Sequence, residues 1–135
     1  MSTILVDNLT GKTTANDITV TVGATATQSL EQGLAKAWFQ FAGRGTATLN
    51  DGLNITSLSD VGTGNYDLSY TNNMANTTYA FSNGQGWDVG ATSSTTSGTD
   101  KDFITTSSLL VLHVNMADGA YDPDISFGSV HGDLA

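Results

Sequence analysis

The sequence predicts an all-β protein, an antiparallel β-sandwich or jelly-roll-like domain, and three observations support this prediction. Short runs rich in β-branched and aromatic residues recur from residue 37 onward at about ten-residue spacing. Clusters of Gly, Asn and Asp, which favour turns, separate these runs. Charged residues make up 13% of the chain, about half of the roughly 25% that is usual. Because strand-forming residues are plentiful, we expect an ordered chain rather than a disordered one.

The first 27 residues are expected to form an N-terminal interface segment. Residues 4–6 and 18–22 are short strand candidates, with a turn between them. Two short strands bury little apolar area alone, so we expect them to pack on another subunit or a neighbouring protein. The alternative is an edge hairpin that packs on its own domain. The expected interface residues of this segment are Ile4, Val6, Ile18 and Val20.

A β-sandwich domain is expected over residues 28–135, and it begins with a short helix at residues 28–36. Leu30 and Leu34 lie four residues apart, on one face of this helix. Thr27 could cap it, and Gly33 limits it to one or two turns.

The strands of the domain follow the alternating and apolar runs. They are expected at residues 37–41, 46–49, 55–58, 66–70, 78–82, 103–106, 108–116 and 125–130. Asp51 and Asp60 are interpreted as turn formers of hairpins. Residues 83–90 are expected to be a glycine-rich loop, and residues 91–98 a flexible loop or an edge strand.

The charge of the chain excludes several functions. The net charge is −9, and the cationic side chains are Lys12, Lys36, Arg44 and Lys101. Four scattered cations cannot form the basic surface that nucleic acids or anionic membranes require. No apolar run approaches about 20 residues, and no signal peptide is recognisable, so membrane insertion is not expected.

Few residues offer catalytic or metal chemistry. His113 lies in an apolar strand, where it is expected to pack at a subunit interface, and His131 lies near the C-terminus. Asp118, Asp122 and Asp124 are dense in oxygen but match no calcium loop, and a solvated turn explains them. No catalytic or cofactor motif is present. We therefore expect no catalytic residue, no metal site and no cofactor.

Aromatic residues suggest a glycan-binding surface. Trp87 lies between Gly84, Gly86 and Gly90, in a segment expected to be an exposed loop, and Tyr121 lies in a second loop. These two residues are the expected ligand contacts, although Trp87 could equally be part of the core. Trp38 is expected in the core or at a trimer interface.

Five motifs follow one another between residues 36 and 81. They are Lys36-Ala37-Trp38, G-x-G-T at 43–46, D-x-x-N-x-x-S at 51–57, D-x-G-T-G-x-Y at 60–66 and M-x-N-x-x-Y-A at 74–80. This block resembles a domain of tailed-bacteriophage virion structural proteins, especially the fibre-type proteins of marine phages. The resemblance implies a non-enzymatic homotrimer, made in the host bacterial cytoplasm and built into the virion as a fibre, spike or adhesin module. Its implied partners are itself, other virion proteins and a host-surface glycan or receptor. A capsid decoration protein and, more remotely, a carbohydrate-active enzyme are the alternatives.

Overall fold

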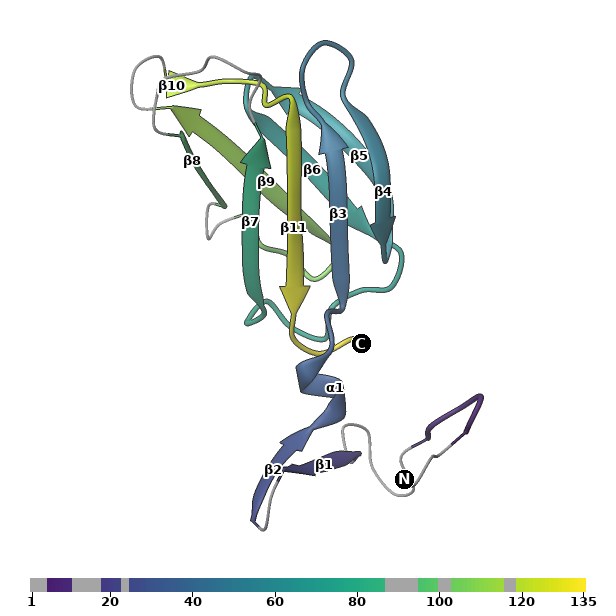
Figure 1. The fold of residues 1–135 in the computed structure, drawn as a ribbon. Coiled ribbons are helices and arrows are strands. Elements are labelled where there is room, and N and C mark those ends of the chain that lie inside the picture. The colour runs from purple at the N-terminus through teal and green to yellow at the C-terminus, as the bar shows by residue number, and fades with distance from the viewer. Residues whose placement is uncertain (1–4, 11–17, 23–24, 87–94, 100–102, 116–118) are drawn as a thin grey trace. The chain divides into compact units, whose positions relative to one another are not determined.

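The computed structural model describes residues 5–10, 18–22, 25–86, 95–99, 103–115 and 119–135 (Figure 1). At residues 22, 95–98 and 115 it describes the backbone alone. The chain divides into two compact units, residues 1–34 and residues 35–135. The described residues form antiparallel sheets and one short helix, which confirms the predicted all-β class.

The N-terminal unit contains a two-stranded antiparallel sheet of β1 (Thr19–Val22) and β2 (Ala26–Ser29). The prediction of a strand at residues 4–6 was wrong at Leu5 and Val6, which belong to no strand, while Ile4 lies outside the described residues. The partner of β1 is instead β2, which follows it directly in the sequence.

The helix α1 (Leu30–Gly33) is one turn long, in agreement with the prediction that Gly33 would keep it short. It begins at Leu30 and not at residue 28 as expected. The cap is Ser29 rather than Thr27, because residues 26–29 pair with β1. The backbone N–H of Gln32 donates to Ser29 Oγ at 3.3 Å. The helix ends at Gly33, and the backbone of the C-cap residue Leu34 is extended. Residues 28–34 therefore belong to the N-terminal unit and not, as expected, to the larger domain.

The larger unit holds two antiparallel sheets (Figure 1). The four-stranded sheet has the order β4-β3-β11-β7, with β3 at Ala37–Ala42, β4 at Thr48–Leu53, β7 at Ala80–Gly86 and β11 at Ile125–His131. The five-stranded sheet has the order β10-β9-β6-β5, with β8 also paired to β9. Its strands are β5 (Ile55–Gly62), β6 (Asn65–Tyr70), β8 (Thr95–Gly98), β9 (Ser108–Asn115) and β10 (Gly119–Ala120).

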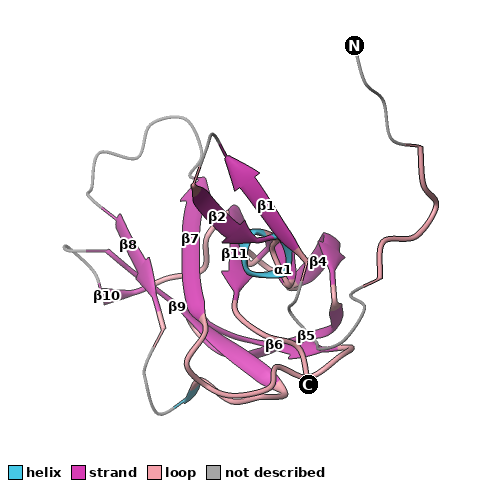
Figure 2. Cartoon of the chain, turned by 90° about the horizontal axis from the view of Figure 1, so that it is seen from below, coloured by secondary structure: helices cyan, strands magenta, loops and turns pink. Residues whose placement is uncertain are grey.

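The core lies between these two sheets, which form two layers in the view from below (Figure 2). Burial alternates along the central strands, because successive side chains of a strand point to opposite faces. β3 and β6 supply the buried aromatic residues, and β9 and β11 add aliphatic ones. These core residues are Ala37, Phe39, Phe41, Tyr66, Leu68, Tyr70, Leu109, Val111 and Val130. The rings of Phe41 and Tyr66 join the two layers, with centroids 4.8 Å apart.

The segment Asn50-Asp51-Gly52 does not form the predicted turn. It lies inside β4, where the register against β3 shifts so that Gln40 pairs with Asp51 and Phe41 with Leu49. Asn50 is thus the extra residue of a β-bulge, and bulges accept the same residue types as turns. The chain turns instead at Asn54, which has φ 59° and leads from one sheet into the other.

The predicted hairpin near Asp60 is confirmed, although Asp60 itself lies in β5 and the turn that leads into β6 is at residues 63–64. The Asp60 carboxylate accepts a hydrogen bond from the N–H of Gly62 at 3.1 Å. Gly64 has φ +72°, and a β-carbon there would lie 2.5 Å from the carbonyl oxygen of His113. This position therefore requires glycine both for its backbone angle and for the close approach of β9.

Two further boundaries differ from the predictions, and one alternative that the sequence left open is decided. β7 continues through residues 83–86, which were expected in a loop, because it pairs with β11 as far as Gly86. Residues 95–98 form the edge strand β8, one of the two predicted alternatives. Residues 103–106 form no strand but contribute an isolated bridge between Ile104 and Leu109.

Candidate functional site

The outer surface of the four-stranded sheet carries exposed aromatic residues. Because Phe39 and Phe41 point into the core, Trp38 and Gln40 point outward. The strand register places Phe127 beside Gln40, and Ser129 beside Trp38. It also places Ser82 of β7 next to Ser129. We call Trp38, Gln40, Ser82, Phe127 and Ser129 the front face.

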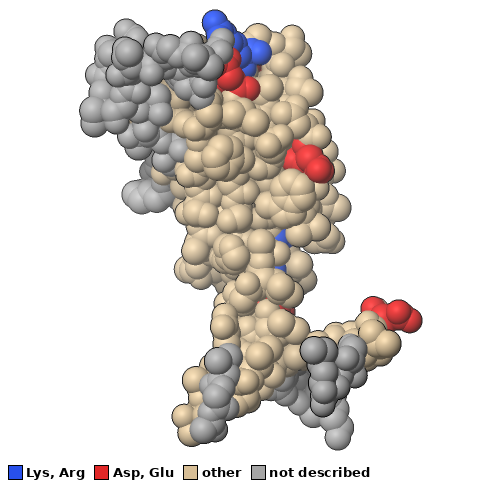
Figure 3. Space-filling model, viewed as in Figure 1, with Lys and Arg blue, Asp and Glu red and all other residues tan. Residues whose placement is uncertain are grey.

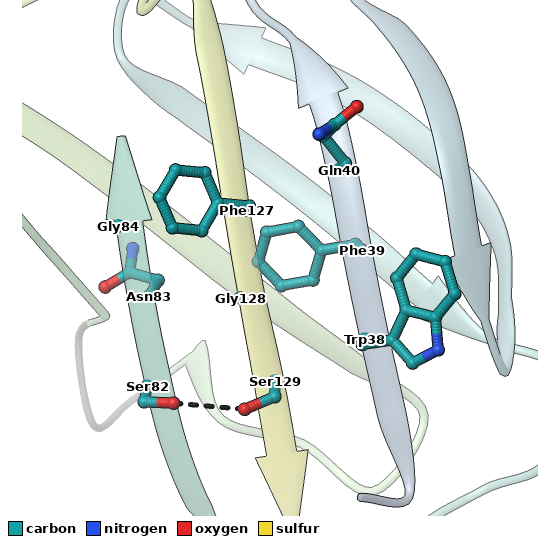
Figure 4. A pocket seen from close by; sticks show the side chains of 9 residues that line it. All are labelled: Trp38, Phe39, Gln40, Ser82, Asn83, Gly84, Phe127, Gly128 and Ser129. Carbon is teal, nitrogen blue, oxygen red and sulfur yellow. Dashed lines mark hydrogen bonds between the residues drawn. The ribbon is translucent and has the colours of Figure 1, made fainter. Parts of the chain in front are cut away.

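The front face surrounds a shallow hollow of about 570 Å³ (Figure 4). Trp38 is 38% exposed and Phe127 is 48% exposed. In Figure 4 the Phe127 ring extends from β11 toward β7, whereas the indole of Trp38 extends to the side of β3 that is away from β11. The hollow lies between them and is lined by Trp38, Phe39, Gln40, Ser82, Asn83, Gly84, Phe127, Gly128 and Ser129.

Because Gly84 has no side chain, it leaves the space that the Phe127 ring occupies. A β-carbon at Gly84 would lie 2.6 Å from Cε2 of Phe127, which is too close for any real contact. The ring therefore occupies the space that a side chain of β7 would fill, and it covers the backbone of the strand. Contact of this kind, between an aromatic ring and a glycine on a neighbouring strand, protects a strand that lacks side chains.

Polar but uncharged groups complete the front face. The hydroxyl oxygens of Ser82 and Ser129 lie 3.1 Å apart, within hydrogen-bonding distance. Among the described residues the amide of Gln40 has no hydrogen-bond partner, so both ends of it can bind a ligand. No charged residue lines the hollow, and the surface over the middle of β7 and β11 shows neither blue nor red atoms (Figure 3).

The outer surface of the five-stranded sheet has a different character. Leu109 and Val111 point into the core, so Leu110 and Leu112 point outward. A hollow of about 450 Å³ lies there. We call its lining the rear face: Val61, Asn65, Asp67, Phe103, Thr105, Ser108, Leu110 and Leu112. Val61 is 58% exposed and Phe103 is 53% exposed, so the rear face presents large apolar side chains to solvent.

His113 lies inside the domain, whereas the sequence suggested a subunit interface. Its side chain is fully buried between the sheets, and Nδ1 lies 2.6 Å from Oε1 of Gln85 on β7. Burial lowers the pKa of His113 to about 4, although the Asp122 carboxylate opposes this effect. The ring is therefore neutral at pH 7, with Nδ1–H donating to Gln85. Its Nε2 atom is buried without a hydrogen-bond partner among the described residues.

The other expected site residues are dispersed. Tyr121 is 8% exposed and packs near the His113 ring, so its burial does not favour the expected ligand contact. Trp87 lies outside the described residues. In the N-terminal unit Val6 is 61% exposed and Val20 is 44% exposed, while Ile18 is half-buried.

Asp122 and Asp124, which precede β11, form hydrogen bonds and an ion pair with other segments of the domain. The hydroxyl of Tyr66 donates to Oδ1 of Asp122 at 2.7 Å, and the same oxygen accepts the N–H of Gly64 at 2.8 Å. Burial and this carboxylate raise the pKa of Tyr66. Arg44 and Asp124 form an ion pair of 3.2 Å. Within the described residues no three His, Cys, Asp or Glu side chains are grouped to hold a metal ion.

No family model matches this chain, and neither the curated proteins nor the solved structures include a significant match. No described helix has the length and apolar character needed to cross a membrane. The arrangement of the front face is suited to binding rather than to proton transfer, because its groups are aromatic rings, hydroxyls and an amide. Sequence reasoning missed Phe127, whose ring lies against a glycine more than forty residues away in the sequence.

Proposed function

We propose that this protein is a non-enzymatic virion structural protein of a tailed bacteriophage. It forms a homotrimeric surface module of the fibre, spike or adhesin type, built on a sandwich or jelly-roll-like domain. The observation that carries the proposal is the exposure of large apolar side chains on both outer faces of one small domain. Exposed apolar patches commonly mark surfaces that contact other molecules.

The positions of the phage-like motifs support this proposal. The motifs run from the start of β3 to the start of β7, so they cover one continuous succession of strands and turns. Trp38 belongs to the front face, Gly64 allows the approach of β9, and Met74 is buried. The resemblance thus concerns residues that shape a fold and its surface.

Two titratable groups of the larger unit support a non-enzymatic role. His113 is buried and neutral, and Asp122 accepts hydrogen bonds that hold a turn in place. General acid–base catalysis requires groups that can reach a substrate. The His113 ring is instead buried in the core, and the Asp122 carboxylate is hydrogen-bonded within the domain.

The rear face supports the homotrimer. Subunit interfaces commonly bury an apolar surface of the kind formed by Leu110, Leu112, Val61 and Phe103.

The N-terminal unit is the proposed attachment segment for other virion proteins. Its two four-residue strands bury little apolar area by themselves, and Val20 is exposed.

Electron microscopy of phage particles labelled with an antibody against this protein tests the proposal. Label at the tail or its fibres is the expected result. Label spread over the head would instead indicate a decoration protein. Purified particles that carry no label, while the lysate contains the protein, would overturn the proposed virion role.

A further inference from the structure

We infer that the front face binds a neutral oligosaccharide, with sugar rings packed against Trp38 and Phe127. The inference gives a ligand class to the proposed surface module, and it rests on that proposal for its biological setting. It concerns the surface of the four-stranded sheet, whereas the sequence pointed to the loops around Trp87 and Tyr121.

The chemistry of the front face matches that of a sugar. A pyranose ring presents C–H groups on its faces and hydroxyls around its edge. The negative faces of the Trp38 and Phe127 rings attract such C–H groups and provide a large contact area. Gln40, Ser82 and Ser129 supply amide and hydroxyl groups that both donate and accept, as sugar hydroxyls do.

The size and openness of the hollow fit a chain of sugars. Its volume of about 570 Å³ lies within the roughly 300–1,000 Å³ of typical ligand sites. The backbone of Gly128 lies at the floor, between the outward side chains of Phe127 and Ser129 on the same strand. A shallow hollow on a sheet surface can receive part of a longer glycan.

The electrostatics of the hollow favour a neutral glycan over an anionic one. The lining carries no charge, and the protein as a whole has a net charge of −9. A polyanion would find no cationic side chain in the hollow and would be repelled by the rest of the protein.

The distribution of polar groups favours a sugar over a second protein chain. Covering Gln40 and the two serines with an apolar protein surface would cost the free energy of their lost hydrogen bonds to water. Sugar hydroxyls replace those bonds directly. The rear face, with Leu110, Leu112 and Phe103, is the more apolar surface and the better match for a protein partner.

Calorimetric titration of the full-length protein tests the inference. The probes are neutral hexasaccharides of glucose, mannose, galactose and N-acetylglucosamine, with a heparin hexasaccharide as the anionic comparison. We expect binding of at least one neutral probe and none of heparin. Trp38→Ala and Phe127→Ala should each weaken that binding at least tenfold, and Gln40→Ala should weaken it severalfold.

The matched control is Leu134→Ala, which removes an apolar side chain that is about as exposed as Trp38 but belongs to neither face. It should leave the affinity unchanged, and a thermal melt of each variant should confirm that the domain remains folded. Gln40 is exposed and outside the core, so its variant keeps the test valid if loss of Trp38 impairs folding.

Three results would overturn the inference. The first is failure of every neutral probe to bind, and the second is equal binding by the wild type and the Trp38 and Phe127 variants. The third is conversion of an oligomer to a monomer by Trp38→Ala, which would identify the front face as a subunit interface. Antibody labelling of particles remains a separate test, so loss of the glycan hypothesis would leave the proposed virion role intact.

Discussion

The front and rear faces of the larger unit are built on one shared core but differ in chemistry. The front face combines two aromatic rings with serine hydroxyls and an amide. The rear face combines aliphatic side chains and a phenyl ring with Asn65 and Asp67, which the strand register places opposite Leu112 and Leu110. The large apolar side chains of the rear face suit a protein surface, which must also supply partners for Asn65 and Asp67 because buried polar groups need them. The hydroxyls and amide of the front face suit a polar ligand.

The largest expected effect comes from placing a charge on the rear face. Leu112→Asp should dissociate the proposed trimer, because an unpaired carboxylate buried in an apolar interface costs about 3–5 kcal/mol. Gln40→Asp introduces the same charge on the front face and should leave the assembly intact. Light scattering measures the mass of both variants, and dissociation by the front-face variant alone would reverse the assignment of the two faces.

The core that supports both faces should be sensitive to acid through His113. The pKa of this group is about 4 in the folded protein and 6.5 in the unfolded chain, so the unfolded state binds more protons between these pH values. The contribution to stability is complete above pH 6.5 and is lost as the pH falls toward 4. The loss amounts to about 3 kcal/mol in the free energy of unfolding.

Denaturant unfolding at several pH values measures this effect. The control is His113→Gln, which keeps a polar side chain of similar reach but does not titrate in this range. Its free energy of unfolding should fall less steeply between pH 6.5 and 4 than that of the wild type. Parallel pH profiles would show that His113 is not the source of the acid sensitivity.

A branched side chain at Gly84 should damage the front face with a moderate loss of stability. Gly84→Val would force the Phe127 ring off β7, and because this ring is the half-exposed end of a flexible side chain, the expected cost is about 1 kcal/mol. Ser82→Ala, two positions earlier on the same outward side of β7, should cost less than about 1 kcal/mol. Thermal melts compare the two, and equal melting temperatures would mean that the ring moves freely.

The smallest effect is expected from Ser129→Ala. The variant removes the 3.1 Å contact between the hydroxyls of Ser129 and Ser82, which are exposed to water that can replace it. The expected cost in stability is about 0.5 kcal/mol, while the effect on glycan affinity should be larger. A stability loss as great as that of Gly84→Val would indicate that this pair supports the sheet rather than the ligand.

Local sequence signals were sufficient where a structure depends on residues close together in the chain. The residue pattern of positions 66–70 predicted β6, and Asp60 predicted the hairpin before it. The same kind of signal was misleading at Asn50-Asp51-Gly52, where a bulge replaced the predicted turn. Turn and bulge accept the same residues, so the choice between them came from the pairing of β4 with β3.

By itself the sequence determined the all-β class, the apolar strand β9 and the neighbourhood of most turns, because these follow from residue type and from a period of two along each strand. The tertiary structure decided which side of each strand faces the core. It placed His113 inside rather than at a subunit interface, extended β7 along β11, and brought Phe127 over Gly84. Each of these outcomes depends on the register between strands distant in the sequence, and a shift of one residue in register would turn every side chain of a strand to the opposite face.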